Sequence, residues 1–168
     1  MNSLIPASIT SLANCTPLQI RYLICALEAE MREALARGEL TEREFPLIHS
    51  FSEGKYTRSI FLPAGSVLVG KLHKHAHPNS ILQGKVTVVT EHGGLETLTA
   101  PCHMTSPAAT KRAIYVHEDT IWTVEHETSS TNLEEIESQV IAKSFSQLGL
   151  EDPVEQLQLT IAHCAVEN

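Results

Sequence analysis

Three histidines fall within five residues of one another, in the segment Lys71-Leu72-His73-Lys74-His75-Ala76-His77-Pro78-Asn79. His73, His75 and His77 stand at alternate positions, so on an extended strand their imidazoles point to the same face. Imidazole nitrogen is a preferred ligand of Zn, Fe, Ni, Cu and Mn, and the spacing therefore predicts a metal site. The alternative is a surface strand whose histidines are solvated.

The length and net charge of the chain limit the functions that such a site can have. The chain has 168 residues and a mass of 18.5 kDa, which suits a single domain with one core. Twelve Lys and Arg against 20 Asp and Glu give a net charge of −8. No basic cluster is present, so neither a nucleic acid nor an anionic membrane is an expected partner.

The remaining compositional signals predict a cytoplasmic protein. No apolar run is long enough for a transmembrane helix, and residues 1–10 lack the basic start of a secretory signal. The four cysteines are scattered and none forms a C-x-x-C pair, which favours reduced, buried thiols over a disulfide framework.

The elements expected to position the histidines are mostly short strands. Apolar and polar residues alternate from Phe45 to Glu127, and turn-forming segments with Gly, Pro or His interrupt the alternation. The runs predicted as strands are Phe45–Phe51, Tyr56–Leu62, Ser66–His73, Ser80–Leu82, Val86–Thr90, Leu95–Thr99, His103–Thr105, Lys111–Val116 and Thr120–His126. Many short strands with no helix between them favour a sandwich or a barrel over a parallel sheet.

Helical patterns flank this β region. Thr16 and Pro17 are typical of a helix start, apolar residues then recur at three- and four-residue spacing, and Gly38 is a stop signal. After the strands, Thr131 and Glu134 match a capping box. We therefore predict one domain over 1–168, with an N-terminal helix at 16–38, a β-barrel at 45–127 and C-terminal helices at 131–165.

The histidine segment and its flanks resemble the cupin superfamily. The first cupin motif runs Gly, five residues, His-x-His, three or four residues, Glu, six residues, Gly. Its spacings are reproduced by Gly65, Lys71, His73, His77 and Gly84. Lys71 stands in the first histidine position and His77 in the glutamate position. An alternative register pairs His73 with His75 and puts Asn79 near the glutamate position, but it fits the glycine spacings worse.

The second cupin motif, Pro-x-Gly-x-x-His, is also altered. The segment Pro107-x-Ala109-x-x-Arg112 keeps its frame and places Arg112 where the ligand histidine stands. His126 is the candidate for the missing ligand. It shares one face of a predicted strand with Trp122 and Val124, and the corresponding strand lines the pocket in a cupin barrel.

Over residues 17–141 the chain is similar to small single-domain cupin proteins of tailed bacteriophages and prophages. The resemblance is carried by Phe51-x-x-Gly54-x-Tyr56-x-Arg58, Pro63-Ala64-Gly65, Gly70-Lys71-x-His73-Lys74, Thr110-Lys111-Arg112, Glu118-Asp119-Thr120-x-Trp122 and Asn132-Leu133-Glu134-Glu135-Ile136-Glu137. It implies a mainly β fold, the cupin double-stranded β-helix or jelly-roll barrel. It also implies His73, His77 and His126 as ligands of Zn, Fe, Mn or Ni, with His75 as an extra or substitute ligand. A homodimer is expected, and host cytoplasm is the expected location of a phage-encoded protein.

Strand alternation also predicts cationic side chains near the metal site. Lys71 and Arg112 are expected to face the barrel interior, and Tyr56 and Arg58 share one face of an earlier strand. Cations beside a metal attract an anion such as a carboxylate or phosphate. We assign Lys71 and Tyr56 to proton transfer, and Arg58, Arg112 and Trp122 to binding a small anionic ligand. The alternative is that each cation pairs with a Glu or lies at the barrel mouth.

Three functions are compatible with these residues. The first is a metal-dependent enzyme, a lyase, isomerase, hydrolase or oxygenase, that acts on a small anion. The second is a non-catalytic module that sequesters a ligand, which the replacement of motif ligands by Lys71 and Arg112 favours. The third is a virion or assembly protein. Of the other histidines, His103 is compatible with either a pocket position or an ordinary position in the sheet. The histidines expected to be structural or solvated are His49, His92, His117 and His163.

Overall fold

The computed structural model describes Leu12 and residues 15–156. Its elements are α1 (Pro17–Ala36), β1 (Leu47–Ser52), β2 (Lys55–Leu62), β3 (Val67–Val69), β4 (Leu72–His73), β5 (His77–Thr90), β6 (Gly94–Thr99), β7 (Cys102–Ser106), β8 (Arg112–Glu127), α2 (Leu133–Val140), β9 (Ile141–Ala142) and the 3-10 helix η2 (Phe145–Leu148). The end of the region predicted as C-terminal helices, together with His163 and Cys164, lies outside the described residues.

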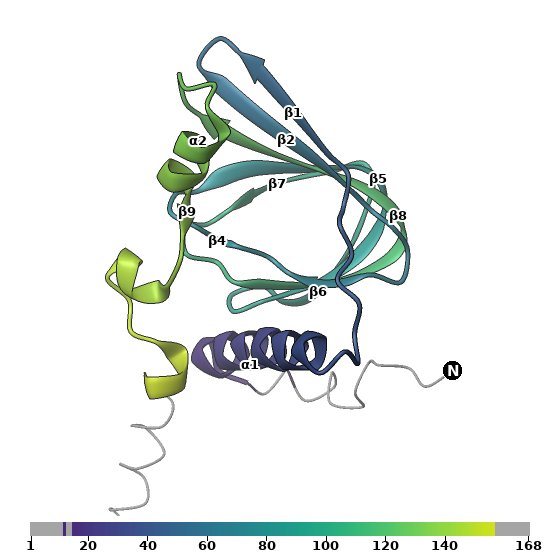
Figure 1. The fold of residues 1–168 in the computed structure, drawn as a ribbon, viewed down its shortest axis with the longest axis vertical. Coiled ribbons are helices and arrows are strands. Elements are labelled where there is room, and N and C mark those ends of the chain that lie inside the picture. Colours follow the sequence, from purple (N-terminus) through teal and green to yellow (C-terminus); the bar gives the residue numbers. More distant parts are fainter. Residues whose placement is uncertain (1–11, 13–14, 157–168) are drawn as a thin grey trace, which may run out of the picture.

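Antiparallel strands form a barrel around the two longest strands, β5 and β8. The strand order is β1-β2-β8-β5-β6, while β3 also pairs with β8 and β7 with β5. Figure 1 shows these strands curving around a common centre, with α1 beneath them and α2 beside them. The predicted fold class, a mainly β jelly-roll barrel with an N-terminal helix and helices after the strands, is confirmed.

Helix α1 begins where the sequence indicates. The hydroxyl of Thr16 accepts from the Gln19 amide, and the Gln19 side chain accepts from the Thr16 amide, which together form a capping box. Gly38 follows the helix with a φ of 74°, in the left-handed region that ends helices. The helix residues buried against the rest of the protein are Ile20, Ile24 and Ala34.

Two strands are longer than predicted. The runs Ser80–Leu82 and Val86–Thr90 both belong to β5, and the runs Lys111–Val116 and Thr120–His126 both belong to β8 apart from Lys111. The expected turns between them are shifts in the register of β5 against β8. Gly84 lies at one such shift with a φ of 90°, and a Cβ there would lie 2.4 Å from the Asp119 carbonyl oxygen. This position therefore requires glycine. In contrast, the single run predicted at Ser66–His73 is divided into β3 and β4.

The N-cap of α2 differs from the prediction. The side-chain oxygen of Asn132 accepts from the Glu135 amide at 3.0 Å, so Asn132 is the cap. The capping box expected from Thr131 and Glu134 is wrong by one residue. Asparagine in an extended conformation reaches the amide three residues ahead as well as threonine does.

The segment after β8 covers one end of the barrel. Buried Ile136 and Val140 of α2 pack against Tyr56 of β2. Strand β9 then pairs with β4, placing Ile141 opposite His73. Figure 1 shows α2 and β9 beside the end of the barrel where β4 lies. The C-terminal segment therefore helps to hold the histidine segment in place.

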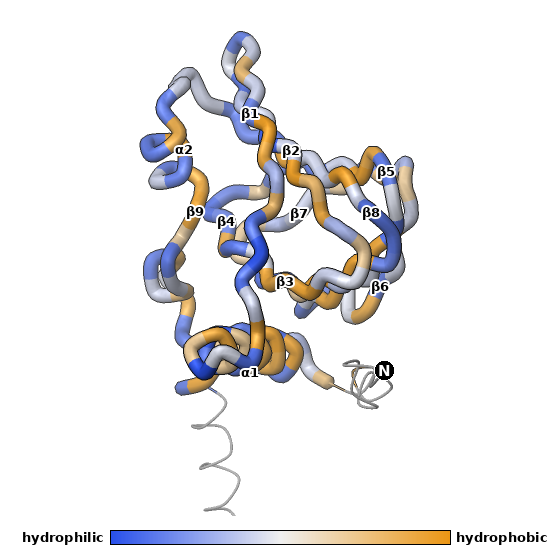
Figure 2. The backbone as a smooth tube through the Cα atoms, turned by 45° about the vertical axis from the view of Figure 1, so that its right-hand side comes forward, coloured by the Kyte–Doolittle hydropathy of each residue, from blue (hydrophilic) through white to orange (hydrophobic). Residues whose placement is uncertain are grey.

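Helix α1 is joined to the barrel by two ion pairs. Arg21 contacts the buried carboxylate of Glu91, which follows β5, and Lys111 Nζ lies 2.8 Å from Glu28 Oε2. The Arg21 guanidinium also lies 4.8 Å from the centroid of the Phe145 ring. A hydrophilic link leads from α1 up to β1 (Figure 2). Helix α1 is thus held against the barrel of its own chain.

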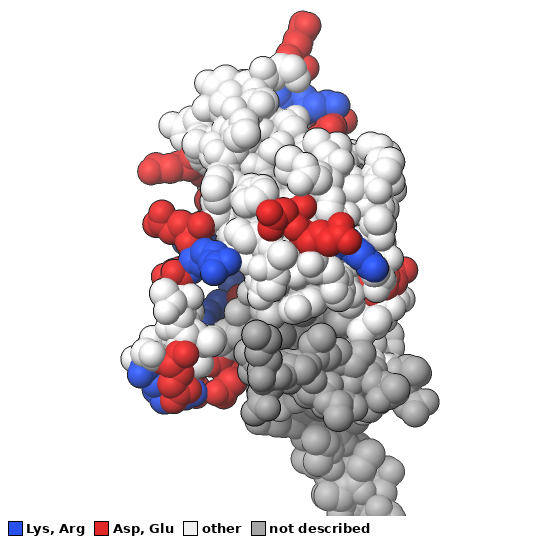
Figure 3. Space-filling view, turned by 90° about the vertical axis from the view of Figure 1, so that its right-hand side faces the viewer, with Lys and Arg blue, Asp and Glu red and all other residues white. Residues whose placement is uncertain are grey.

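The surface reflects the acidic composition. On the face shown in Figure 3, acidic side chains outnumber basic ones. Within the described part of the chain, no helix is long and apolar enough to cross a bilayer. Cys25 and Cys102 are free thiols, as expected.

Candidate metal centre

Three histidines from separate strands meet at one end of the barrel. His73 ends β4, His77 begins β5 and His126 lies near the end of β8. The ring centroids of His73 and His77 are 4.0 Å apart, and His126 lies 5.1 Å and 5.0 Å from them. One ligating atom from each residue lies within 4.8 Å of the others. The structure therefore brings together the three residues that the resemblance assigned to the metal.

Burial keeps these imidazoles neutral. Desolvation lowers the pKa of His73 from 6.5 to about 2, and the neighbouring His77 and His126 lower it further. The same cause lowers the pKa of His126 to about 4 and also lowers the pKa of His77. Because neutral imidazole has a free lone pair, all three residues are in the form that binds metal at neutral pH.

The hydrogen bonds of the cluster fit a metal ion. His77 Nδ1 lies 3.0 Å from the carbonyl oxygen of His75, so this nitrogen donates and the Nε2 lone pair is left for a ligand role. His73 Nδ1 is buried and has no hydrogen-bond partner among the described residues. A metal ion bound here would be held by one nitrogen from each of the three imidazoles. Three imidazoles would leave coordination positions open for a ligand.

His75 lies outside this group. Its side chain is exposed, and its contribution to the cluster is the carbonyl oxygen that holds His77. The expectation of His75 as an extra ligand therefore differs from the structure. The chain turns between β4 and β5, so alternate residues here do not share a face as they would along a continuous strand.

The other described histidines have partners of their own. His103 Nδ1 lies 2.8 Å from Ser80 Oγ, and His117 Nε2 lies 2.7 Å from Thr87 Oγ1, both on exposed strand surface. Exposed His49 bonds a tyrosine hydroxyl, and His92 lies 3.6 Å from a Glu91 oxygen. None of these four joins the metal group within residues 15–156.

A small pocket adjoins the histidine cluster inside the barrel. Its volume is about 100 Å³, and besides His73 and His77 its polar lining includes Arg58, Asn79, Ser106 and Arg112. Ile60, Leu62, Leu68, Ile114 and Val124 form its apolar wall, and Trp122 also lines it. The predicted interior positions of Arg58, Arg112 and Trp122 therefore agree with the structure.

Arg112 is held in the pocket by neutral groups. Its Nη2 donates to Ser106 Oγ at 2.5 Å, and its guanidinium lies 5.3 Å from the centroid of the Trp122 ring. Ser106 Oγ also accepts from Asn79 Nδ2 at 2.8 Å, and Trp122 Nε1 donates to Asn79 Oδ1 at 3.0 Å. Burial lowers the pKa of Arg112, and the charge of Glu96 opposes this. An arginine stays protonated even so.

The two residues assigned to proton transfer are engaged by other side chains. Lys71 lies among the pocket-lining residues, as expected for an interior position, but its side chain is 53% exposed and its ammonium group contacts Glu137 of α2. The short strand β4 starts after Lys71, which leaves its side chain able to reach α2. Tyr56 is buried, but its hydroxyl lies 2.7 Å from His49 Nδ1 and it is not among the pocket-lining residues. Desolvation raises the pKa of Tyr56.

The sequence suggested Asn79 only in the alternative register and did not suggest Ser106. Both are 2% exposed. Asn79 Nδ2 also donates to the His77 carbonyl oxygen at 3.1 Å, so the two residues connect His77, Trp122 and Arg112. A signal for Asn79 was present, since it stands two residues after His77 on the inward face. Ser106 offered no such signal, because only strand pairing places it opposite His77.

No family model matches this sequence. No curated protein matches it either. The solved structures that align with it include ectoine synthase from P. lautus, over 60% of this chain and 75% of that chain, with 10% identity and a TM-score of 0.48. A cupin-2 domain containing protein from Shewanella frigidimarina aligns over 55% of this chain and 90% of its own, with 7% identity and a TM-score of 0.42. An RmlC-like cupin family protein with a double-stranded β-helix fold, from Methanocaldococcus jannaschii, aligns over 52% and 92% respectively, with 14% identity and a TM-score of 0.40.

Proposed function

We propose that this chain is a metal-binding cupin that holds a divalent transition ion and binds a small anion beside it. His73, His77 and His126 would hold the ion, as Zn, Fe, Mn or Ni. The observation that carries the proposal is the meeting of three neutral imidazoles from three strands, two of them buried and that of His73 partly buried, with ligating atoms within 4.8 Å of one another. When bound, the ion would supply a Lewis acid that polarises an oxygen ligand.

The anionic nature of the ligand is supported by the two arginines of the pocket. Arg112 forms no ion pair with a carboxylate in the described part of the chain, and Arg58 makes no ion pair or hydrogen bond there. A partly buried cation without a counter-charge is costly, and a metal ion would add further positive charge. An anion in the pocket would offset the positive charge of the arginines and that of the metal ion.

Binding without turnover is favoured over catalysis by the positions of Lys71 and Tyr56. Each already has a partner outside the pocket, Glu137 and His49 respectively. Among the lining side chains other than the histidines, Lys71 is engaged by Glu137 and the two arginines stay protonated, so none of them is a free acid–base group. The enzyme, acting as a lyase, isomerase, hydrolase or oxygenase, is the second candidate. Tight retention of an anion through purification with no chemical change by mass spectrometry would support the binding module, whereas its conversion would support the enzyme.

The setting and assembly are part of the same proposal. The resemblance to small phage and prophage cupins supports a phage-encoded protein in the host cytoplasm, and recovery in purified virions would instead support an assembly role.

We also propose a homodimer. Leu23 and Leu27 of α1 remain 45% and 37% exposed after the helix has packed on its own barrel. Light scattering of the purified chain would measure the mass.

Elemental analysis of protein purified without a histidine tag tests the metal site. We expect one ion per chain in the wild type and loss of that ion in His77→Ala and His126→Ala. His103→Ala is the matched control, since His103 is an exposed strand histidine bonded to Ser80. Circular dichroism would establish that the variants fold. Equal metal content in all of these proteins, or none in the wild type after incubation with each ion, would contradict the proposal.

A further inference from the structure

The polar end of the pocket is built to present a guanidinium group. Arg112 has five N–H donors, of which Ser106 takes one, so four remain. Asn79 holds Ser106, and the ring of Trp122 lies against the guanidinium. The orientation of Arg112 is therefore set before a ligand arrives, and preorganised, planar donors suit a carboxylate.

The guanidinium of Arg112 is available to pair with a ligand. The charge of Glu96 acts on Arg112, but Arg112 forms no ion pair within residues 15–156. Its bonded partner is a neutral hydroxyl. The carboxylate of a ligand would supply the direct counter-charge.

Part of the pocket lining is apolar. Ile60, Leu68, Ile114 and Val124 line it, and they offer no hydrogen bond to an oxygen atom. A phosphate or sulfate would place oxygens against this wall without partners, which is unfavourable for a buried polar group. A ligand with a carboxylate at one end and a hydrocarbon body at the other would match both walls.

We propose that the pocket binds a short-chain monocarboxylate, its carboxylate accepting from Arg112 and its hydrocarbon body against Leu68 and Ile114. The volume of about 100 Å³ limits the size of the ligand. With about 30 Å³ for each non-hydrogen atom, as for water, the pocket holds about three such atoms, so the ligand is close to acetate or propionate in size. The inference deepens the proposed function, because it names the ligand class of the same pocket.

Calorimetric titration of the full chain tests this inference, with acetate, propionate, butyrate, hexanoate, malonate and inorganic phosphate as probes. We expect acetate or propionate to bind at least tenfold more tightly than hexanoate, malonate or phosphate. Arg112→Gln should weaken this binding at least tenfold, since it removes a charge-assisted pair of hydrogen bonds. Arg32→Gln is the matched control, because Arg32 lies on the exposed face of α1 with its side chain 73% exposed.

A second variant keeps the test independent of folding defects in Arg112→Gln. Leu68→Ala enlarges the apolar end, so the preferred chain length should increase while Arg112 is untouched. Binding of phosphate or malonate as tight as that of propionate would overturn the inference. So would an affinity that neither variant changes.

Titrations before and after treatment with a chelator separate this inference from the metal proposal. Metal retained without saturable carboxylate binding overturns the inference alone. Carboxylate binding that depends on Arg112, in a protein with no affinity for metal, overturns the metal proposal and supports the inference.

Discussion

The ion pair between Arg21 and Glu91 should contribute far more to stability than its single contact suggests. The side chains are 16% and 3% exposed, so the carboxylate is inside the protein. Arg21→Met leaves that carboxylate buried, with His92 Nε2, 3.6 Å away, as its remaining ion-pair candidate among the described residues. Removing one partner of a buried pair costs about 3–5 kcal/mol. Because Arg21 retains some contact with solvent, we expect about 3 kcal/mol, or a fall in Tm of about 6–12 °C.

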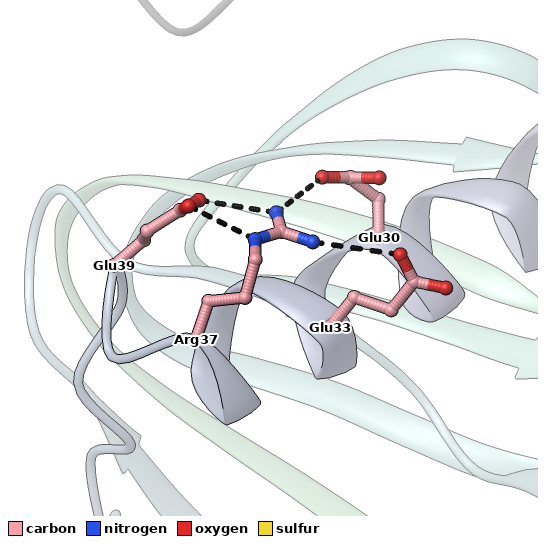
Figure 4. A network of polar contacts seen from close by, with 4 residues as sticks. All are labelled: Glu30, Glu33, Arg37 and Glu39. Atoms are coloured by element: carbon pink, nitrogen blue, oxygen red, sulfur yellow. Dashed lines mark hydrogen bonds and ion pairs between the residues drawn. The ribbon is translucent and has the colours of Figure 1, made fainter.

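Arg37 provides a control with more partners and less burial. Its guanidinium contacts Glu30, Glu33 and Glu39 at the end of α1 (Figure 4). The Arg37 side chain is nevertheless 45% exposed, and solvent screens such pairs. Arg37→Met should therefore leave Tm unchanged within error. If burial determines how much an ion pair contributes to the free energy of unfolding, the one buried ion pair of Arg21 contributes more than the three exposed ion pairs of Arg37.

A double variant tests the same reasoning more sharply. Replacing both members of a buried pair by apolar side chains of similar size is often neutral or stabilising. Arg21→Met with Glu91→Met should therefore be more stable than Arg21→Met alone.

Urea denaturation measures all four proteins with two probes. Fluorescence reports on the chain's single tryptophan, Trp122, in the barrel, and circular dichroism reports on the helices. A loss below about 1 kcal/mol in Arg21→Met, or a double variant less stable than that single variant, would refute the reasoning.

Three further predictions concern local features. Gly84→Ala should lower the free energy of unfolding by about 3 kcal/mol in urea denaturation, because a Cβ would lie 2.4 Å from the backbone of β8 at a φ of 90°. Asn132→Ala should cost about 1 kcal/mol by thermal denaturation through loss of the α2 N-cap, and an unchanged Tm would argue against that role. The hydrogen bond from Lys71 lowers the pKa of Glu137 below 4.5, so its contribution is present at neutral pH and is lost as the pH falls through the lowered pKa. In Lys71→Met, the titration midpoint of Glu137 by NMR should rise toward 4.5; a midpoint that stays the same would contradict this assignment.

The local pattern of the chain predicted most of its elements. Capping at Thr16 and the stop at Gly38 placed α1 to within a residue, because these signals act through neighbouring backbone groups. The alternation of apolar and polar residues located the strands, but it divided β5 and β8 into two predicted strands each. The glycine and polar residues at a β-bulge have the composition of a turn. The difference between a turn and a bulge lies in the partner strand, which the local sequence does not contain.

Alternation also placed Trp122, Val124 and Arg112 on the inward face of β8, because side-chain direction along one strand has a period of two. It failed for His75, where the chain turns between β4 and β5, and it gave no sign that Lys71, which lines the pocket, is paired with Glu137 of α2. A rule for side-chain direction holds only within a continuous strand.

The sequence by itself determined which residue types are available for the site and the strand faces they occupy. It supplied His73, His77, His126 and the substitution of Arg112 for a ligand histidine. Tertiary structure alone decided that Tyr56 is held by His49, and that Asn79 and Ser106 connect the metal centre to Arg112. These contacts depend on the register between strands distant in sequence, and register is set by the packing of the whole barrel.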